Sequence, residues 1–418
     1  MPDTTIKPAV AAVAEPLKLT TETATHASLV AALTHLDLQP AVQLPTGFKI
    51  TEVPIAAGLH LTPIGLLTPT LGPLAAFTGT FTGNGFNTIF RPDSPTTPTP
   101  LPIPVAGSDN VLELNLTSET LSFSPALGSV PNRGMVQGDA FLNGVPYLQS
   151  ISDVTNPAQP TGIHLEPGLW ICVPPTTDPK EGQEVARMAS IPHGTTVLAQ
   201  GTSSTINGPP VIPPVDITPF QGATKFPFAS QTATSHGSAR IPQDLTSFIA
   251  AGTITQAMLT DPNTVLRNAI AGQHITHTTV INISTSPASP LFGGGAENIA
   301  FLMGDAGGVK PNARTTLMTA TFWIETVQHT ILAPIFKVGD PPLIVQPEGP
   351  APLGGVNPSF IVHPPGPIPI PRPITVTSTQ IQYSQTVMLS FNGLTWPHVS
   401  VATLRPSSAI PIPPGAWV

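Results

Sequence analysis

The sequence predicts a folded, mostly β protein built as an antiparallel, up-and-down β-barrel, with a few short helices and long Pro-rich loops. The chain holds 54 prolines and 35 glycines in 418 residues, yet only 9% of its residues are charged. Disordered chains normally combine high charge with few apolar residues. Here 40% of the residues are hydrophobic, and many lie in short Val/Ile/Leu/Thr runs between turn residues. Short strands at this spacing, joined in chain order, are typical of an up-and-down barrel.

Changes in composition divide the chain into three expected segments. Residues 1–65 form an N-terminal arm, with a short amphipathic helix over 21–36 where apolar residues recur at helical spacing. Residues 66–201 form a lipocalin-like β-barrel. Residues 202–418 form a second β-rich domain with a helical insert near 244–272.

The first informative strand begins near Phe77. The glycines at positions 79, 83 and 85 share one period-two register with Phe77 and Phe81. In a strand, such glycines mark a bend, a bulge or the close approach of another backbone. Small barrels need these devices to curl a strand sharply.

The remainder of the first half alternates apolar and polar residues. Residues 111–117 have one apolar face, Thr117-Ser118-Glu119 is interpreted as a turn, and Asn143-Gly144 is interpreted as a hairpin turn. Further strands are expected at 162–165, 168–173, 186–191 and 195–199.

In the second half, residues 202–241 are expected to form a Pro/Ser/Thr-rich connection. Asp261 followed by Pro262 favours the start of a helix, and Gly272 favours its end. Residues 334–373 form a proline-dense excursion. Strands are expected at 275–284, 298–303, 317–327, 374–381, 387–391 and 399–404.

A short pattern occurs in both halves. The apolar strands Leu169-Trp170-Ile171 and Phe322-Trp323-Ile324 each precede a Pro-His segment, Pro192-His193 and Pro397-His398 respectively. Two related barrel units are therefore one interpretation, and one elaborated β domain is the other.

Composition also limits the function. A net charge of −8 and only 15 Lys and Arg, without a run of them, argue against nucleic-acid binding. No stretch approaches the ~18 apolar residues of a membrane span, and the start lacks a secretory pattern, so we expect a soluble, cytoplasmic protein. The single cysteine, Cys172, lies in an apolar stretch and is expected to be a buried packing residue.

Histidines are the main candidate ligand residues of this chain, because few of its residues are charged. His193 and His398 each follow a proline at the start of a β segment, and proline fixes the local backbone. Each could bond neighbouring backbone at a barrel rim. Each could instead be an axial ligand to a heme iron, which needs a neutral imidazole beside an apolar cavity. His164, between apolar neighbours, is a secondary candidate.

Three other side chains belong to the candidate site. Tyr383 could ligate iron or serve as a structural hydroxyl. Arg133 and Arg187 are rare cations here, and each could pair with a heme propionate or with a carboxylate such as Glu166 or Glu325.

Residues 77–89 resemble the glycine-patterned first strand of nitrobindin-like proteins, which are small lipocalin-like barrels that hold heme. That family has Trp where Phe77 stands and a Pro-Thr-Ile ending, of which Asn87-Thr88-Ile89 keeps the last two residues. Its axial histidine comes from the closing part of the barrel, and His193 is the nearest counterpart. Several stretches also resemble a bacterial and fungal group of heme-binding proteins. They are residues 168–170, 191–195, 320–326, 379–385 and 396–404.

Three functions are compatible with these observations. The first is a heme-binding β-barrel protein; if the chain is an enzyme, we expect a heme-dependent, peroxidase-like oxidoreductase. The second is a binder or cyclase-type enzyme for an apolar lipid or polyketide-like ligand, because lipocalin-type lumens suit such molecules. The third is a structural assembly protein, and a homo-oligomer is compatible with all three.

Overall fold

The computed structural model describes residues 69–417, apart from 95, 97, 107, 235, 287–293, 306–309 and 349–356. The chain divides into two compact units, Met1–Ile64 and Gly65–Val418, and every described residue belongs to the second. The arm and helix expected over residues 1–65 lie outside the described residues.

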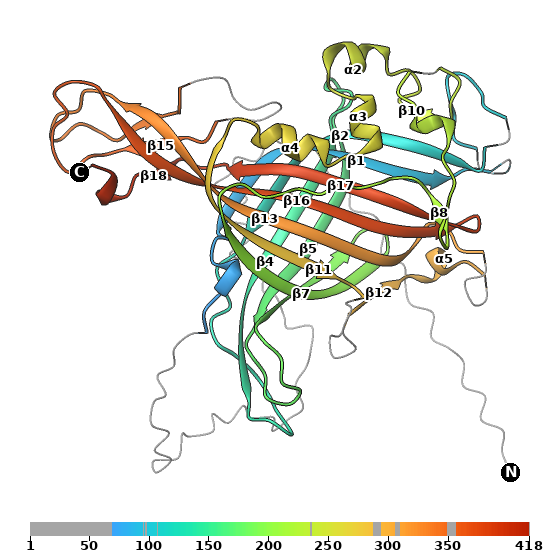
Figure 1. Cartoon of the computed structure of the whole chain (residues 1–418), viewed down its shortest axis with the longest axis horizontal. Coiled ribbons are helices and arrows are strands. Elements are labelled where there is room, and N and C mark those ends of the chain that lie inside the picture. Colours follow the sequence, from blue (N-terminus) through green and yellow to red (C-terminus); the bar gives the residue numbers. More distant parts are fainter. Residues whose placement is uncertain are drawn as a thin grey trace, which may run out of the picture. The chain divides into compact units, whose positions relative to one another are not determined.

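In this part of the chain, ten antiparallel strands form a closed barrel, which confirms the predicted fold class (Figure 1). Neighbours along the ring follow chain order, and the last strand pairs with the first. The ring strands are β1 (Gly79–Pro92), β2 (Asn110–Phe123), β4 (Ala140–Asp153), β5 (Thr161–Val173), β6 (Glu184–Ile191), β7 (Thr195–Asn207), β11 (His274–Ser284), β13 (Arg314–Ala333), β16 (Arg372–Phe391) and β17 (Leu394–Pro406).

The closing pair depends on two of the predicted glycines. A Cβ on Gly83 would lie 1.9 Å from the carbonyl oxygen of Thr403, and one on Gly85 would lie 2.2 Å from that of Val401. Both carbonyls belong to β17, so glycine lets the first and last strands approach closely. The expectation that these positions mark close backbone contact is confirmed.

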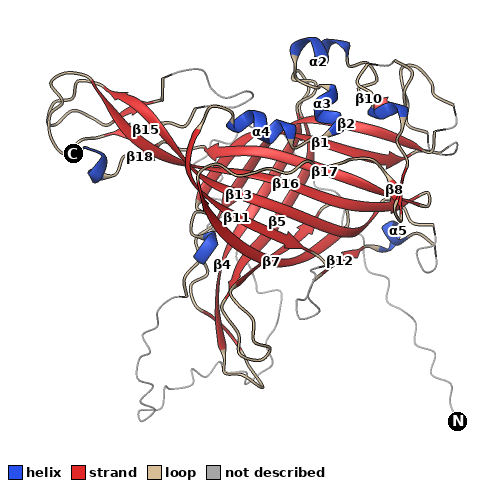
Figure 2. Ribbon diagram, viewed as in Figure 1, coloured by secondary structure: helices blue, strands red, loops and turns tan. Residues whose placement is uncertain are grey.

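Short helices cover part of the outer wall (Figure 2). Four of them lie in the connection between β7 and β11, and Phe228, the N-cap of the first of these, reaches the barrel: it stacks on Trp396 of β17 and lies 5.8 Å from Phe90 of β1. The helices are η1 (Gly72–Leu74), η2 (Ala229–Gln231), α2 (Thr246–Ala251), α3 (Gln256–Thr260), α4 (Thr264–Ile270), α5 (Ala300–Met303) and η4 (Pro414–Trp417). Of these, η2, α2, α3 and α4 form the connection. None in the described part has the length and apolar character needed to cross a membrane.

Two strands continue beyond the barrel. Strands β13 and β16 are each 20 residues long, and their outer ends supply Ile331, Ala333, Ile374 and Val376 to a second hydrophobic core. A small sheet of β14 (Leu343–Val345), β15 (Phe360–Val362) and β18 (Ile410–Pro411) completes that core. The remaining short strands are β3 (Val130–Asn132), β8 (Phe220–Gln221), β9 (Thr224–Lys225), β10 (Arg240–Ile241) and β12 (Gly295–Asn298).

The expected boundary at residue 201 falls inside this barrel. Strand β7 runs through it from Thr195 to Asn207, and β11 pairs with β7 along that length. Strands from both halves of the chain therefore build one ring, and the described residues contain no second barrel.

Several local predictions were also wrong. Thr117-Ser118-Glu119 lies in the middle of β2, and Asn143-Gly144 lies inside β4, so neither is a turn. The strand expected at 298–303 is mostly the helix α5. The helical insert is confirmed, although it consists of three short helices, and the segments expected at 374–381 and 387–391 are one strand, β16.

Candidate functional site

Alternate residues of the ring strands face the barrel interior, and a band of polar side chains lies among them. Arg187 of β6 is its centre. Its Nε donates to the Tyr147 hydroxyl at 2.8 Å, its Nη1 to Gln385 Oε1 at 2.7 Å and its Nη2 to Glu166 Oε1 at 2.5 Å. The Tyr147 hydroxyl also donates to Glu166. Every partner of this guanidinium is therefore a side chain of the barrel itself.

Aromatic rings surround the same cation. The guanidinium carbon of Arg187 lies 5.5 Å from the ring centres of Tyr147 and Phe322 and 5.7 Å from that of Trp170. Cation–π contacts of this kind favour a desolvated guanidinium. Burial alone would raise the pKa of Glu166, but the Arg187 charge and the hydrogen bonds from His164 and Tyr147 lower that pKa to about 2. Glu166 and Arg187 thus form a buried ion pair at neutral pH.

A second network lies across the interior. The Tyr383 hydroxyl donates to Glu119 Oε2 at 2.6 Å, and Thr117 Oγ1 donates to Glu119 Oε1 at 2.8 Å. Gln149 Nε2 donates to both Glu119 and Tyr383. Burial raises the pKa of Glu119, although these hydrogen bonds oppose the rise. Tyr383 therefore has a buried structural hydroxyl.

Three histidines meet beyond this polar band. His164 and His193 have ring centres 5.6 Å apart, and both lie close enough to His398 to lower its pKa. His164 comes from β5, His193 from the turn between β6 and β7, and His398 from β17. The structure therefore brings together the two histidines that the sequence singled out and the secondary candidate.

His193 is the most accessible of the three. It is exposed, and its ring hydrogen-bonds the backbone of Ile163. Burial of part of the ring and the nearby His164 lower its pKa, so the imidazole is neutral at neutral pH. An imidazole oriented by backbone through one nitrogen presents the other nitrogen as a ligand.

His398 is held differently. Its Nε2 lies 3.1 Å from Asn87 Nδ2 and therefore accepts a hydrogen bond from that amide. Burial lowers the pKa of His398 to about 3, with a further contribution from His164 and His193. The Oδ1 of Asn87 is buried and has no hydrogen-bond partner among the described residues. This end of the barrel thus offers a ligand one unused acceptor.

Arg133 lies away from these groups. Its side chain is 87% exposed and pairs with Asp139 at 3.5 Å. Its predicted role at a cofactor stays a prediction. Arg187, in contrast, pairs with Glu166, which was one of the two partners expected for it.

The histidine cluster was tested as a metal site. Within the described ranges, no set of three His, Cys, Asp or Glu side chains is arranged to hold a metal ion. A bare ion held by protein side chains alone is therefore unsupported there. Heme makes a smaller demand, because its iron needs only one axial imidazole from the protein.

Two pockets stand out in the described part of the chain, with volumes of about 630 and 380 Å³. Neither is lined by the Arg187 network, the Glu119 network or the three histidines. The middle of the barrel is filled by polar and aromatic side chains, so a ligand at the histidines would bind at the end of the barrel and not at its centre.

Sequence reasoning missed Glu119 and underrated Glu166 and Gln149. Each is a buried polar side chain of a ring strand. In a chain with 9% charged residues, an acidic residue in such a place is a signal of a buried partner.

Comparisons with known proteins do not assign this chain to a family. No family model matches it, and no curated protein matches it. Among solved structures, it is similar to the crystal structure of Rv2717c from M. tuberculosis, with 11% sequence identity and a TM-score of 0.32. The similarity covers 82% of this chain and 99% of that one. A likeness at this level carries no argument about function.

Proposed function

We propose that this chain is a heme-binding β-barrel protein whose axial ligand is His193. The supporting observation is the state of the His193 ring, which is neutral, accessible and hydrogen-bonded to the backbone of Ile163. An imidazole that meets these three conditions keeps its second ring nitrogen available to bind iron. The resemblance of residues 77–89 to nitrobindin-like barrels agrees with this assignment.

His398 is the weaker ligand in this proposal. Its Nε2 accepts a hydrogen bond from Asn87, and iron binding at that nitrogen would break the bond. The neighbouring Asn87 Oδ1 remains available to a donor on the bound molecule. Heme held here would supply redox and peroxide chemistry. Among the chain's own groups, His164 is the nearby candidate for moving a proton, because its Nε2 lies 3.1 Å from Glu166.

The test is a hemin titration followed by the Soret absorbance band. We expect the wild-type chain to shift the band and His193→Ala to weaken binding by at least about tenfold, the effect of losing a metal ligand or its support. His398→Ala should retain binding. His236→Ala is the matched control, because His236 is an exposed histidine paired with Asp244 elsewhere on the surface.

Other outcomes would contradict the proposal in distinct ways. A wild-type chain that leaves the hemin spectrum unchanged would reject heme as the ligand. Binding that survives His193→Ala but is lost in His398→Ala would show that the axial residue is His398. Equal losses in His193→Ala and His236→Ala would indicate nonspecific binding to surface histidines.

A further inference from the structure

The 630 Å³ pocket lies outside the barrel, beside the end of α4. It is lined by outward-facing residues of β13, β16 and β17 and by residues 271–274, which follow α4. Hydrogen bonds connect these elements. Gln380 Nε2 donates to Gln273 Oε1 at 3.1 Å, and Gln273 Nε2 donates to Gln380 Oε1 at 3.3 Å. Gln382 Nε2 donates to the Leu266 carbonyl at 3.0 Å. The pocket volume falls within the range of small-molecule sites.

The wall of this pocket contains an unsatisfied cation. Arg405 of β17 is only 7% exposed, and its Nη2 is buried without a hydrogen-bond partner among the described residues. No ion pair to Arg405 is formed within the described ranges either. A buried guanidinium that lacks a partner is costly unless something else supplies one.

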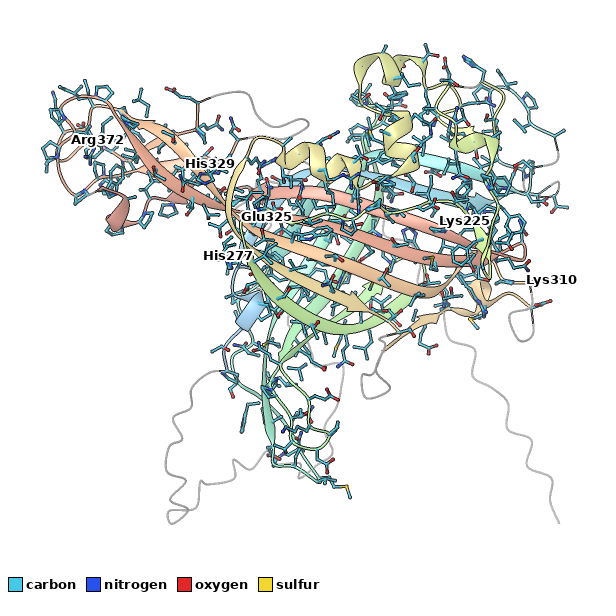
Figure 3. All side chains as sticks on the ribbon, in the orientation of Figure 1. Lys225, His277, Lys310, Glu325, His329 and Arg372 are labelled. Atoms are coloured by element: carbon cyan, nitrogen blue, oxygen red, sulfur yellow. The ribbon has the colours of Figure 1, made fainter. Side chains whose placement is uncertain are left out.

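The nearest acid does not neutralise this charge. Glu325 of β13 is fully buried and accepts a hydrogen bond from Gln380 Nε2 at 2.5 Å (Figure 3 labels Glu325 and His329 of this strand). Burial raises the pKa of Glu325 to about 8, although Gln380 and the Arg405 charge oppose the rise. Among the described residues Glu325 and Arg405 form no ion pair, so the guanidinium has no bonded counter-charge.

Other groups at the pocket add hydrogen-bonding capacity. His329 Nε2 lies 2.8 Å from Ser378 Oγ, and burial together with the Arg405 charge lowers the pKa of His329 to about 4. His274 and Glu348 are exposed members of the lining, so Glu348 places one negative charge at the outer edge. Leu332 and Pro373 supply exposed apolar surface.

From these contacts we infer that the pocket binds a small organic carboxylate, whose anionic head pairs with Arg405 and whose apolar body lies along Leu332 and Pro373. An arginine is suited to this ligand because its planar guanidinium matches a carboxylate in two parallel hydrogen bonds. The apolar part of the lining favours an organic acid over an inorganic anion. This site shares no residue with the histidine cluster, so it does not depend on the proposed heme function.

The experiment uses the full chain and fluorine NMR, with 4-(trifluoromethyl)benzoate as the probe. Its neutral amide, 4-(trifluoromethyl)benzamide, has the same apolar body and serves as the ligand control. We expect the benzoate to bind, the amide to bind at least about tenfold more weakly, and Arg405→Gln to weaken benzoate binding by a similar factor, as expected for loss of a charge-assisted hydrogen bond. Arg91→Gln, which changes an arginine of the neighbouring strand β1 that pairs with Glu113 on the surface, should bind like the wild type.

A second variant tests the pocket independently, in case Arg405→Gln does not fold. Ala271 is an exposed member of the pocket lining, so Ala271→Trp should fill the pocket without removing a charge or a core contact. We expect it to weaken benzoate binding while the circular dichroism spectrum stays unchanged. If Arg405→Gln does not fold, Ala271→Trp decides the question alone.

Several results would overturn the inference. They are failure of the wild-type chain to bind the benzoate, equal binding of benzoate and amide, and benzoate binding that is unchanged in both pocket variants. Stronger displacement of the probe by inorganic phosphate than by unlabelled benzoate would also overturn it, because it would identify an inorganic anion site. Hemin titration of Arg405→Gln should match the wild type, so failure here and failure of the heme proposal can be told apart.

Discussion

Arg187 donates from Nη2 to Glu166 Oε1 at 2.5 Å inside the barrel, where the two side chains are 3% and 1% exposed. Tyr147 and Gln385 accept hydrogen bonds from Nε and Nη1 of the guanidinium, and three aromatic rings lie around it. Such a buried pair is weak evidence for added stability relative to an apolar core, but breaking it leaves one unpaired charge in a medium of low dielectric constant. Replacing only one of the two residues should therefore destabilise the fold more than replacing both.

Glu166→Gln should lower the free energy of unfolding by about 3–5 kcal/mol, because it leaves Arg187 buried without its counter-charge. The double variant Glu166→Gln/Arg187→Met should recover much of that loss. Urea denaturation measures both. The control is Glu113→Gln, which breaks the partly exposed pair with Arg91 and should cost no more than about 1 kcal/mol. A loss in Glu166→Gln no larger than in the control would contradict the assigned role.

The same pair should make stability depend on acid. The pKa of Glu166 is about 2 in the folded chain, below its ordinary value of 4.5. A lowered carboxyl pKa contributes stability above pH 4.5, and that contribution is lost as the pH falls towards 2. The difference in unfolding free energy between wild type and Glu166→Gln should therefore shrink over this window. A difference that stays constant from pH 5 to pH 2.5 would argue against an ionised Glu166.

Glu325 should show the opposite sign. Its folded-state pKa is raised to about 8 from 4.5, so its contribution to stability is fully present below pH 4.5 and is lost as the pH rises through 8. Glu325→Gln should be more stable than the wild type at pH 8, by up to about 4 kcal/mol, and the gain should fade towards pH 5. Thermal unfolding of the two proteins across this range checks the prediction. Glu113→Gln, at a partly exposed carboxylate, should show no such trend.

Closure of the barrel should be sensitive to a single methyl group. Gly85→Ala would place a Cβ 2.2 Å from the Val401 carbonyl oxygen and 2.7 Å from Thr117 Oγ1. We expect a loss of more than about 3 kcal/mol or failure to fold, since backbone on the neighbouring strand must move. Gly162→Ala in β5 is the matched control, because nothing lies within 4 Å of its added Cβ. Equal stability of the two variants would show that the strands separate readily at Gly85.

Hemin affinity should fall in acid through His193. Protons and iron compete for the same imidazole nitrogen, and the pKa of His193 lies below 6.5. Affinity should therefore stay level from pH 8 to pH 6.5 and decline below it. A Soret titration at several pH values measures this, and the residual binding of His193→Ala should not follow the same curve. A decline that begins above pH 6.5 would implicate another group.

The alternation of residues 111–117 and the glycines near Phe81 were enough to predict a curled antiparallel sheet. They were not enough to find its inner face. Polar residues such as Glu119 and Asn143 look like turn residues in a sequence, because a buried partner on another strand is not visible there. In the folded chain, Glu119 is satisfied by Tyr383, and Asn143 Nδ2 donates to the Pro69 carbonyl at 2.6 Å.

The site was predictable only in part. His193 and His398 stood out because each follows a proline, and the structure brings them together. Their meeting depends on closure of the ring, which no local pattern reveals. The pocket at Arg405 was not predicted, since Glu325, Gln380 and Arg405 come from three strands and become neighbours only through the strand pairing.

Closure between β1 and β17 also has a consequence during synthesis. Asn87 and His398, which touch across that seam, are 311 residues apart in the chain. A nascent polypeptide on the ribosome therefore exposes the unpaired edge of β1 until β17 emerges, and open edges of this kind invite pairing with other chains. Cellular yield should depend on how well chaperones shield that edge during translation.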